Sequence, residues 1–209
     1  GSYADGFSKA HGPSISAMGW RFKDARYALE QAVKRGAQRC EHADYEDDQG
    51  RPIGAIHGIG DSLIYFLDAD SADNLYRKIG FLPEARVTAK KDCGFILVDH
   101  LTNNVRQGAL AKWSSFYKDI FDFTEVRYFN IRGQKTGLRS FALKSPCGTF
   151  CIPINEGSEQ KSQINEYLEE YNGEGIQHIA FMTHDMCRSL SQVGSSINFL
   201  DIDPSYYRD

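Results

Sequence analysis

Two short apolar segments each contain a single histidine: His100 lies in residues 95–105 (FILVDHLTNNV) and His178 in residues 175–182 (GIQHIAFM). An unpaired polar group away from water costs about 1–3 kcal/mol, so each imidazole needs a partner. Neutral imidazole is the commonest protein ligand for iron, zinc and copper. Because the two histidines occupy matching places in a repeated pattern, they predict a shared metal ion. The alternative is that each is a hydrogen-bonded core residue.

Two imidazoles do not complete a metal site. A carboxylate would complete the two-histidine, one-carboxylate triad of non-haem Fe(II) oxygenases. Glu156 and Asp201 are available, but the pattern nominates neither. The pattern assigns no ligand role to the other histidines, His11, His42, His57 and His184.

The elements that would position these histidines repeat about every eighty residues, which is typical of duplicated supersecondary units. Each unit begins with a strand that leads into an amphipathic helix. The three strand–helix pairs are 15–22 with 24–35, 95–101 with 106–121, and 176–183 with a helix from 185. Later strands are predicted at 62–67, 125–131, 138–143 and 150–154, and a further helix at 164–171.

The repeats divide the chain into two domains. Residues 1–90 hold the first unit and a linker over 78–91, and residues 91–209 hold the second and third units. The third unit stops before its later strands. We therefore expect a piece of something longer, with an unpaired sheet edge and exposed apolar surface.

Composition excludes several classes of protein. The 209 residues suffice for one or two domains with a sizeable core, and the net charge is −4 with scattered Lys and Arg, which gives no reason to expect nucleic acid. No apolar run reaches membrane-spanning length. The five cysteines form no CxxC pair and read as free thiols. These features predict a cytoplasmic protein with no membrane partner.

Several motifs together resemble 4-hydroxyphenylpyruvate dioxygenases. VDHLTNNV at 98–105 looks like the first ligand strand of that family. Others match in order and spacing: HGPS at 11–14, IHGIG at 56–60, PINE at 153–156, KSQI at 161–164, YL at 167–168 and GEGIQHIA at 173–180. The resemblance covers nearly the whole chain. It is strongest to bacterial members, some of which carry haemolysin or legiolysin-type names.

The resemblance implies an α+β fold of the vicinal-oxygen-chelate (glyoxalase/bleomycin-resistance-like) type. Its βαβββ modules pair two per domain and form curved, open-barrel sheets. Residues 1–90 would be the second module of the N-terminal domain plus the linker. Residues 91–209 would be the C-terminal metal-binding domain, truncated, with its last module incomplete. Family members are homo-oligomers, so the same is expected here.

The resemblance also implies site residues. His100 and His178 would be two of three Fe(II) ligands, and the third, a glutamate, would lie beyond Asp209. Gln177 would at most contact a metal ligand rather than the metal itself, because strand alternation turns it away from His178. Substrate-binding roles carry over to Ser140, Asn155 and Gln163.

The implied reaction converts 4-hydroxyphenylpyruvate and O2 to homogentisate and CO2, in tyrosine and phenylalanine catabolism. The α-keto acid is its own reductant, so Fe(II) is the only cofactor expected. Without the third ligand, this chain by itself is expected to be inactive. Two alternatives stay open: 4-hydroxymandelate synthase, and a metal-free binding or structural module of the same scaffold.

Overall fold

The computed structural model describes the chain except for residues 48, 70–91, 133–136, 160, 195–196 and 201–209. The linker predicted over 78–91 and Asp201 therefore lie outside the described residues. No helix in the described part is both long enough and apolar enough to cross a membrane.

The first unit forms a three-stranded sheet in the order β1-β3-β2. Its elements are α1 (Tyr3–His11), β1 (Ala17–Phe22), α2 (Ala25–Lys34), β2 (Ala55–His57), the 3-10 turn η1 (Ile59–Asp61) and β3 (Leu63–Asp68). Helix α2 begins where predicted because the Asp24 carboxylate accepts the Tyr27 N–H at 2.8 Å. After α2, an isolated bridge joins Arg39 to Ile56 of β2.

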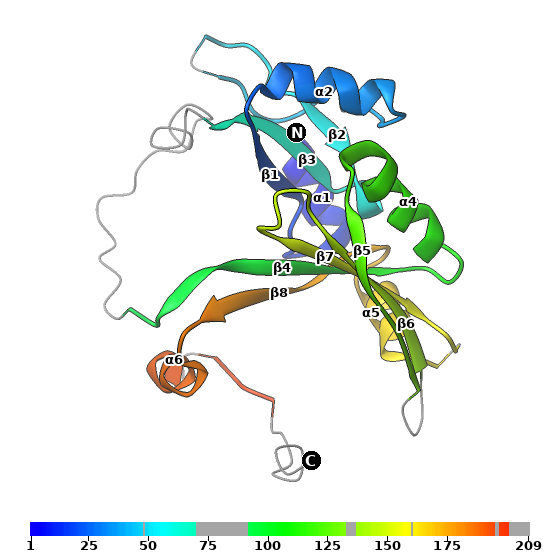
Figure 1. Cartoon of the computed structure of the whole chain (residues 1–209), viewed down its shortest axis with the longest axis vertical. Helices are drawn as coiled ribbons and strands as arrows, with labels where there is room; N and C mark the ends of the chain where they lie inside the picture. Colours follow the sequence, from blue (N-terminus) through cyan, green and yellow to red (C-terminus); the bar gives the residue numbers. More distant parts are fainter. Residues whose placement is uncertain (48, 70–91, 133–136, 160, 195–196, 201–209) are drawn as a thin grey trace.

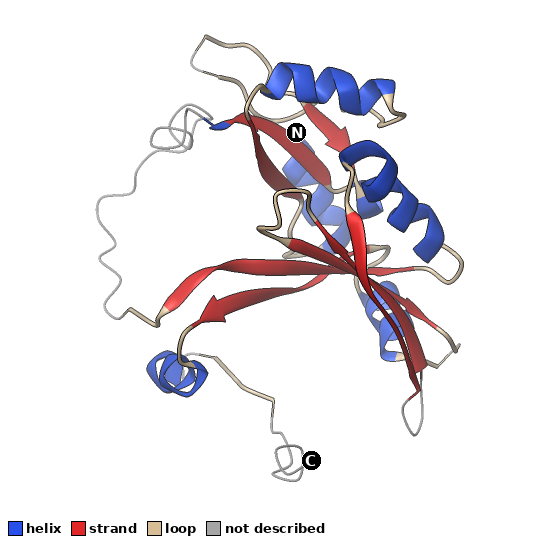
Figure 2. Ribbon diagram, viewed as in Figure 1, coloured by secondary structure: helices blue, strands red, loops and turns tan. Residues whose placement is uncertain are grey.

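The second unit is a complete βαβββ module, and the third adds one strand to its sheet (Figures 1 and 2). The five-stranded sheet has the order β5-β6-β7-β4-β8. Strand β8 therefore lies at an edge, as expected, and Phe181 is 51% exposed there. The elements are β4 (Phe95–Val105), α4 (Leu110–Phe121), β5 (Thr124–Arg132), β6 (Gly137–Lys144), β7 (Cys151–Gly157), α5 (Gln163–Glu170), β8 (Gly175–Thr183) and α6 (Met186–Val193).

One face of the five-stranded sheet is apolar and shares a core with the first unit. The strand registers place Val105, Ile154 and Leu143 on this face, and all three are buried in one cluster with residues of α2, α4 and β3. Trp20 of β1 joins the units, since its ring contacts Phe121 at 4.8 Å between centroids. Burial of this face determines which strand residues face the core, and the opposite face is left for polar residues.

Tyr117 provides a test of this core. Its side chain is fully buried, burial raises the pKa of its phenol, and its hydroxyl has no hydrogen-bond partner among the described residues. Because a buried hydroxyl without a partner destabilises the folded state, Tyr117→Phe should raise the free energy of unfolding by about 1 kcal/mol. Tyr117→Ala should lower it by about 3–5 kcal/mol. Denaturant titration measures both, with exposed Tyr27→Phe as the matched control. A marked loss of stability in Tyr117→Phe would show that the hydroxyl is bonded.

Candidate metal centre

The pairing of β4 with β8 brings the two predicted histidines together. His178 lies opposite Thr102, and His100 lies opposite Ala180, so the imidazoles occupy diagonal positions on adjacent strands. Their ring centroids are 5.6 Å apart, and the ring planes meet at 74°. Figure 1 shows these two strands running side by side for most of their length.

This separation fits two ligands of one ion. With a metal–nitrogen bond of about 2.1 Å, an ion lies roughly 3 Å from the centre of each bound ring, so two rings on one ion are at most roughly 6 Å apart. The observed 5.6 Å satisfies that limit.

Each ring is oriented by a hydrogen bond at Nδ1. His100 Nδ1 lies 2.7 Å from a carboxylate oxygen of Asp99, and His178 Nδ1 contacts the amide oxygen of Gln177. These oxygens can only accept, so both Nδ1 atoms donate, and each neutral ring keeps the lone pair on Nε2. That is the arrangement in which protein imidazoles bind metals.

Both orienting residues lie at irregularities of the β4–β8 ladder. The register shifts between Val98 and His100, and again where β8 passes from Ile176 to His178. The prediction that alternation turns Gln177 away from His178 is therefore wrong. Asp99 was missed altogether, although its position next to His100 was a usable signal.

The environment favours neutral imidazole at His178. Partial burial and then the neighbouring His100 lower the pKa of His178. The unprotonated ring is the form that can donate a lone pair to a metal.

A third protein ligand is not found in the part of the chain that the structure describes. No group of three or more His, Cys, Asp or Glu residues there could hold a metal ion. Glu156 lies on the apolar face, where its buried carboxylate accepts the N–H groups of Gly108 and Leu110 and pairs with Arg139. It therefore anchors the start of α4.

Two predicted substrate-binding residues lie in one row across the sheet. Ser140 of β6 is opposite Asn155 of β7, which is opposite Asn104 of β4. The Asn155 amide donates to the Asn104 side-chain oxygen at 3.3 Å. Asn104 shares the His100 face and lies two residues beyond Thr102, so the row is roughly 7 Å along the strand from His178. Sequence reasoning missed Asn104.

Among the described residues, no hydrogen bond or ion pair joins the Gln163 side chain to this row. Gln163 is the exposed first residue of α5, and no side-chain hydrogen bond is found for it within the described residues.

Comparisons with known proteins bear on this arrangement. Residues 1–89 match the family described as hydroxyphenylpyruvate dioxygenase, HPPD, N-terminal, and residues 97–198 match the glyoxalase/bleomycin resistance protein/dioxygenase superfamily. Protein MelA of Shewanella colwelliana is 56% identical over 96% of this chain and 58% of its own length. The 4-hydroxyphenylpyruvate dioxygenase of Legionella pneumophila strain Corby is 42% identical over 98% of this chain and 57% of its own length.

Over nearly its whole length, the chain is similar to 4-hydroxyphenylpyruvate dioxygenases. It spans a little over half the length of these relatives. A mutant 4-hydroxymandelate synthase from Streptomyces coelicolor superposes with a TM-score of 0.79 at 22% identity, covering 97% of this chain and 59% of that one, which shows the fold. The predicted α+β, vicinal-oxygen-chelate fold class is confirmed, with mixed sheets and no closed barrel among the described residues.

A cavity of about 660 Å³ adjoins His100. It lies between β1 and the β6–β7 hairpin, and its walls include Trp20 and Phe150. Cys147 sits on its wall, and hydrogen bonds from Ser145 and Thr149 lower the pKa of the Cys147 thiol. The Thr149 hydroxyl is 2.9 Å from the sulfur.

The lowered pKa predicts selective alkylation of Cys147. The thiolate is the nucleophile, so the reaction with iodoacetamide should slow at neutral pH in Ser145→Ala and Thr149→Val, and its pH midpoint should rise. Mass spectrometry of alkylated peptides measures this. Exposed Cys187 is the internal control, and its rate should not change. An unchanged midpoint for Cys147 in both variants would refute the assigned cause.

Proposed function

We propose that this chain carries two of the three iron ligands of a non-haem Fe(II) dioxygenase. That enzyme would convert 4-hydroxyphenylpyruvate and O2 to homogentisate and CO2 in cytoplasmic tyrosine and phenylalanine breakdown. The observation that carries the proposal is the pair of imidazoles 5.6 Å apart, each held through Nδ1 with Nε2 free. The relatives' names support the substrate.

The proposed division of labour follows the two domains. Residues 1–90 form the second module of an N-terminal domain with its linker, and residues 91–209 form part of the C-terminal metal-binding domain. The third ligand, a glutamate, would come from sequence that the relatives have and this chain does not span. By itself the chain is then expected to be inactive, and homo-oligomers are expected for the whole protein.

Each proposed residue has a distinct task. Fe(II), bound at Nε2 of His100 and His178, would supply the activation of O2. Asp99 and Gln177 hold the two rings in the tautomer that can bind it.

Substrate orientation falls to the polar row. Asn155 and Ser140 would hydrogen-bond substrate oxygens. Their row lies roughly 7 Å along the strand from His178, a separation that one aromatic ring of the substrate can span. Gln163 would have to turn toward the same face to join them.

The alternatives differ in a measurable product. A 4-hydroxymandelate synthase would use the same substrate and scaffold but oxidise the side chain. Likeness to such an enzyme at 22% identity supports only the fold, so homogentisate is the proposed product. A metal-free binding or structural module would form neither product.

Metal titration tests the site directly. Co(II), an air-stable probe for Fe(II), should bind with micromolar affinity, followed by isothermal calorimetry and d–d absorption. The dissociation constant should rise at least about 100-fold in the His100→Ala, His178→Ala double variant and about 10-fold in Asp99→Ala. His42→Ala, at an exposed histidine, is the matched control. Equal binding by the double variant would refute the site, and absence of binding in a longer protein containing this sequence would favour the metal-free module.

Activity in such a longer protein tests substrate and product together. O2 uptake with 4-hydroxyphenylpyruvate should yield homogentisate, identified by liquid chromatography and mass spectrometry. Asn155→Ala should raise KM about 10-fold, the loss expected for one hydrogen bond to substrate, and leave Co(II) affinity unchanged. Gln107→Ala, at an exposed turn, is the control. Hydroxymandelate as the product would replace this proposal with the alternative enzyme.

A further inference from the structure

A second cavity lies in the first unit, away from both histidine-bearing strands. Its volume is about 600 Å³, and its walls come from α2, from the segment that precedes β2, and from the end of β3. This volume is within the range of small-molecule sites. No residue of the candidate metal centre contributes to it, so a ligand in this cavity would bind independently of the proposed function.

The floor of this cavity is apolar. Leu29 and Phe66 are buried beneath it, and Ile53 and Leu67 add further apolar surface. Gly54 lets the backbone pass closely under α2, because a Cβ there would collide with the Leu29 side chain. The floor can therefore contact an apolar body such as an aryl or branched alkyl group.

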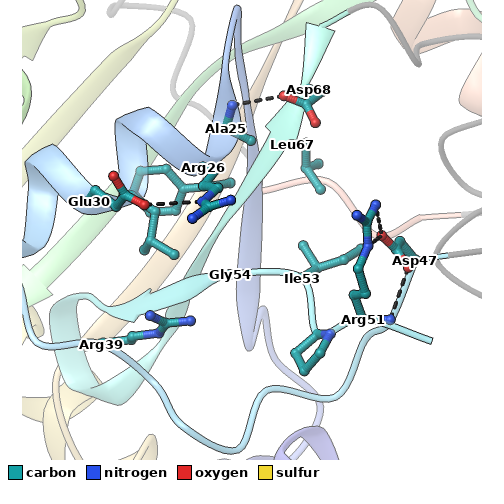
Figure 3. Close-up of a pocket in the computed structure, with 13 residues that line it drawn as sticks. Ala25, Arg26, Glu30, Arg39, Asp47, Arg51, Ile53, Gly54, Leu67 and Asp68 are labelled. Atoms are coloured by element: carbon teal, nitrogen blue, oxygen red, sulfur yellow. Dashed lines mark hydrogen bonds and ion pairs between the residues drawn. The ribbon is translucent and has the colours of Figure 1, made fainter. Parts of the chain in front are cut away.

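The rim of the cavity carries three arginines, of which two are already paired. Arg26 pairs with Glu30 at 3.1 Å, and Arg51 pairs with Asp47 at 2.7 Å. For Arg39, no ion pair or side-chain hydrogen bond is found among the described residues. Figure 3 shows the guanidinium groups of Arg26 and Arg39 on either side of Gly54.

The charge balance selects the class of ligand. The third carboxylate of the lining, Asp68, accepts the Ala25 N–H at 2.8 Å and brings the formal charge of the lining to zero. A dianion such as phosphate would meet these carboxylates with little net attraction. A single carboxylate fits the fork of one free guanidinium, which binds it bidentately.

We propose that this cavity binds a small organic monocarboxylate with an apolar body. The ligand carboxylate pairs with Arg39, and Arg26 lies on the same rim. The apolar body of the ligand contacts Leu29, Ile53 and Leu67. A phenyl ring on a short carboxylate chain is small enough to enter this cavity.

The test uses 3-phenylpropionate as the probe and 3-phenylpropan-1-ol as its neutral counterpart. Both are titrated into the chain up to about 10 mM and followed by amide chemical shifts and calorimetry, since weak ligands bind near 1 mM. The background is the His100→Ala, His178→Ala variant, so the candidate metal centre cannot account for binding. Shifts are expected at Gly54, Ile53 and neighbouring amides.

Variants distinguish specific binding at Arg39 from non-specific binding. Arg39→Gln should raise the dissociation constant at least about tenfold, and Arg39→Glu should abolish binding within the range. Arg188→Gln, on α6, is the matched control and should have no effect. Because Arg39 is exposed, circular dichroism should show all three variants folded. Absence of binding, equal binding of the alcohol, or unchanged affinity in folded Arg39→Gln would each overturn the proposal.

Discussion

The antiparallel pairing of β4 with β8 is the interaction on which the candidate site depends. Among the described residues, it is the only strand pairing that brings His100 of the second unit next to His178 of the third. A regular ladder would have placed the imidazoles diagonally but left them without orienting partners. The two register shifts place Asp99 and Gln177 at the rings, so the irregularities position the ligands.

The rest of the fold holds that pairing in place from the opposite face. Val105 and Ile154 are fully buried there, and Glu156 ties the start of α4 to the sheet through two backbone N–H groups. Because a shift of one residue would move Glu156 into the polar face and Asn155 into the core, the β4–β7 register is strongly specified. The polar face therefore depends on the burial of the apolar one.

Periodicity predicted the large elements because they bury one face. Helix α4 and strand β7 show this most clearly, and the candidate ligands followed from two imidazoles in apolar strands. Helix α1 was not predicted, since only Phe7 of its nine residues is buried and the pattern is weak. The bulges at Asp99 and Gln177 could not be predicted either. They depend on cross-strand pairing between segments far apart in the chain, which alternation within one strand does not contain.

Exposure along β4 explains why the candidate centre has room for a further ligand. Residues 95–98 are apolar yet 42–48% exposed, whereas Thr102, Asn103 and Val105 are buried. Successive residues of a strand face opposite sides, so the first half of β4 is open on both faces and the second half is closed on both. His100 lies at the boundary, with 27% of its side chain exposed. An ion held there would be supported by the packed half of the sheet, while the open half would give a third ligand access to its remaining positions.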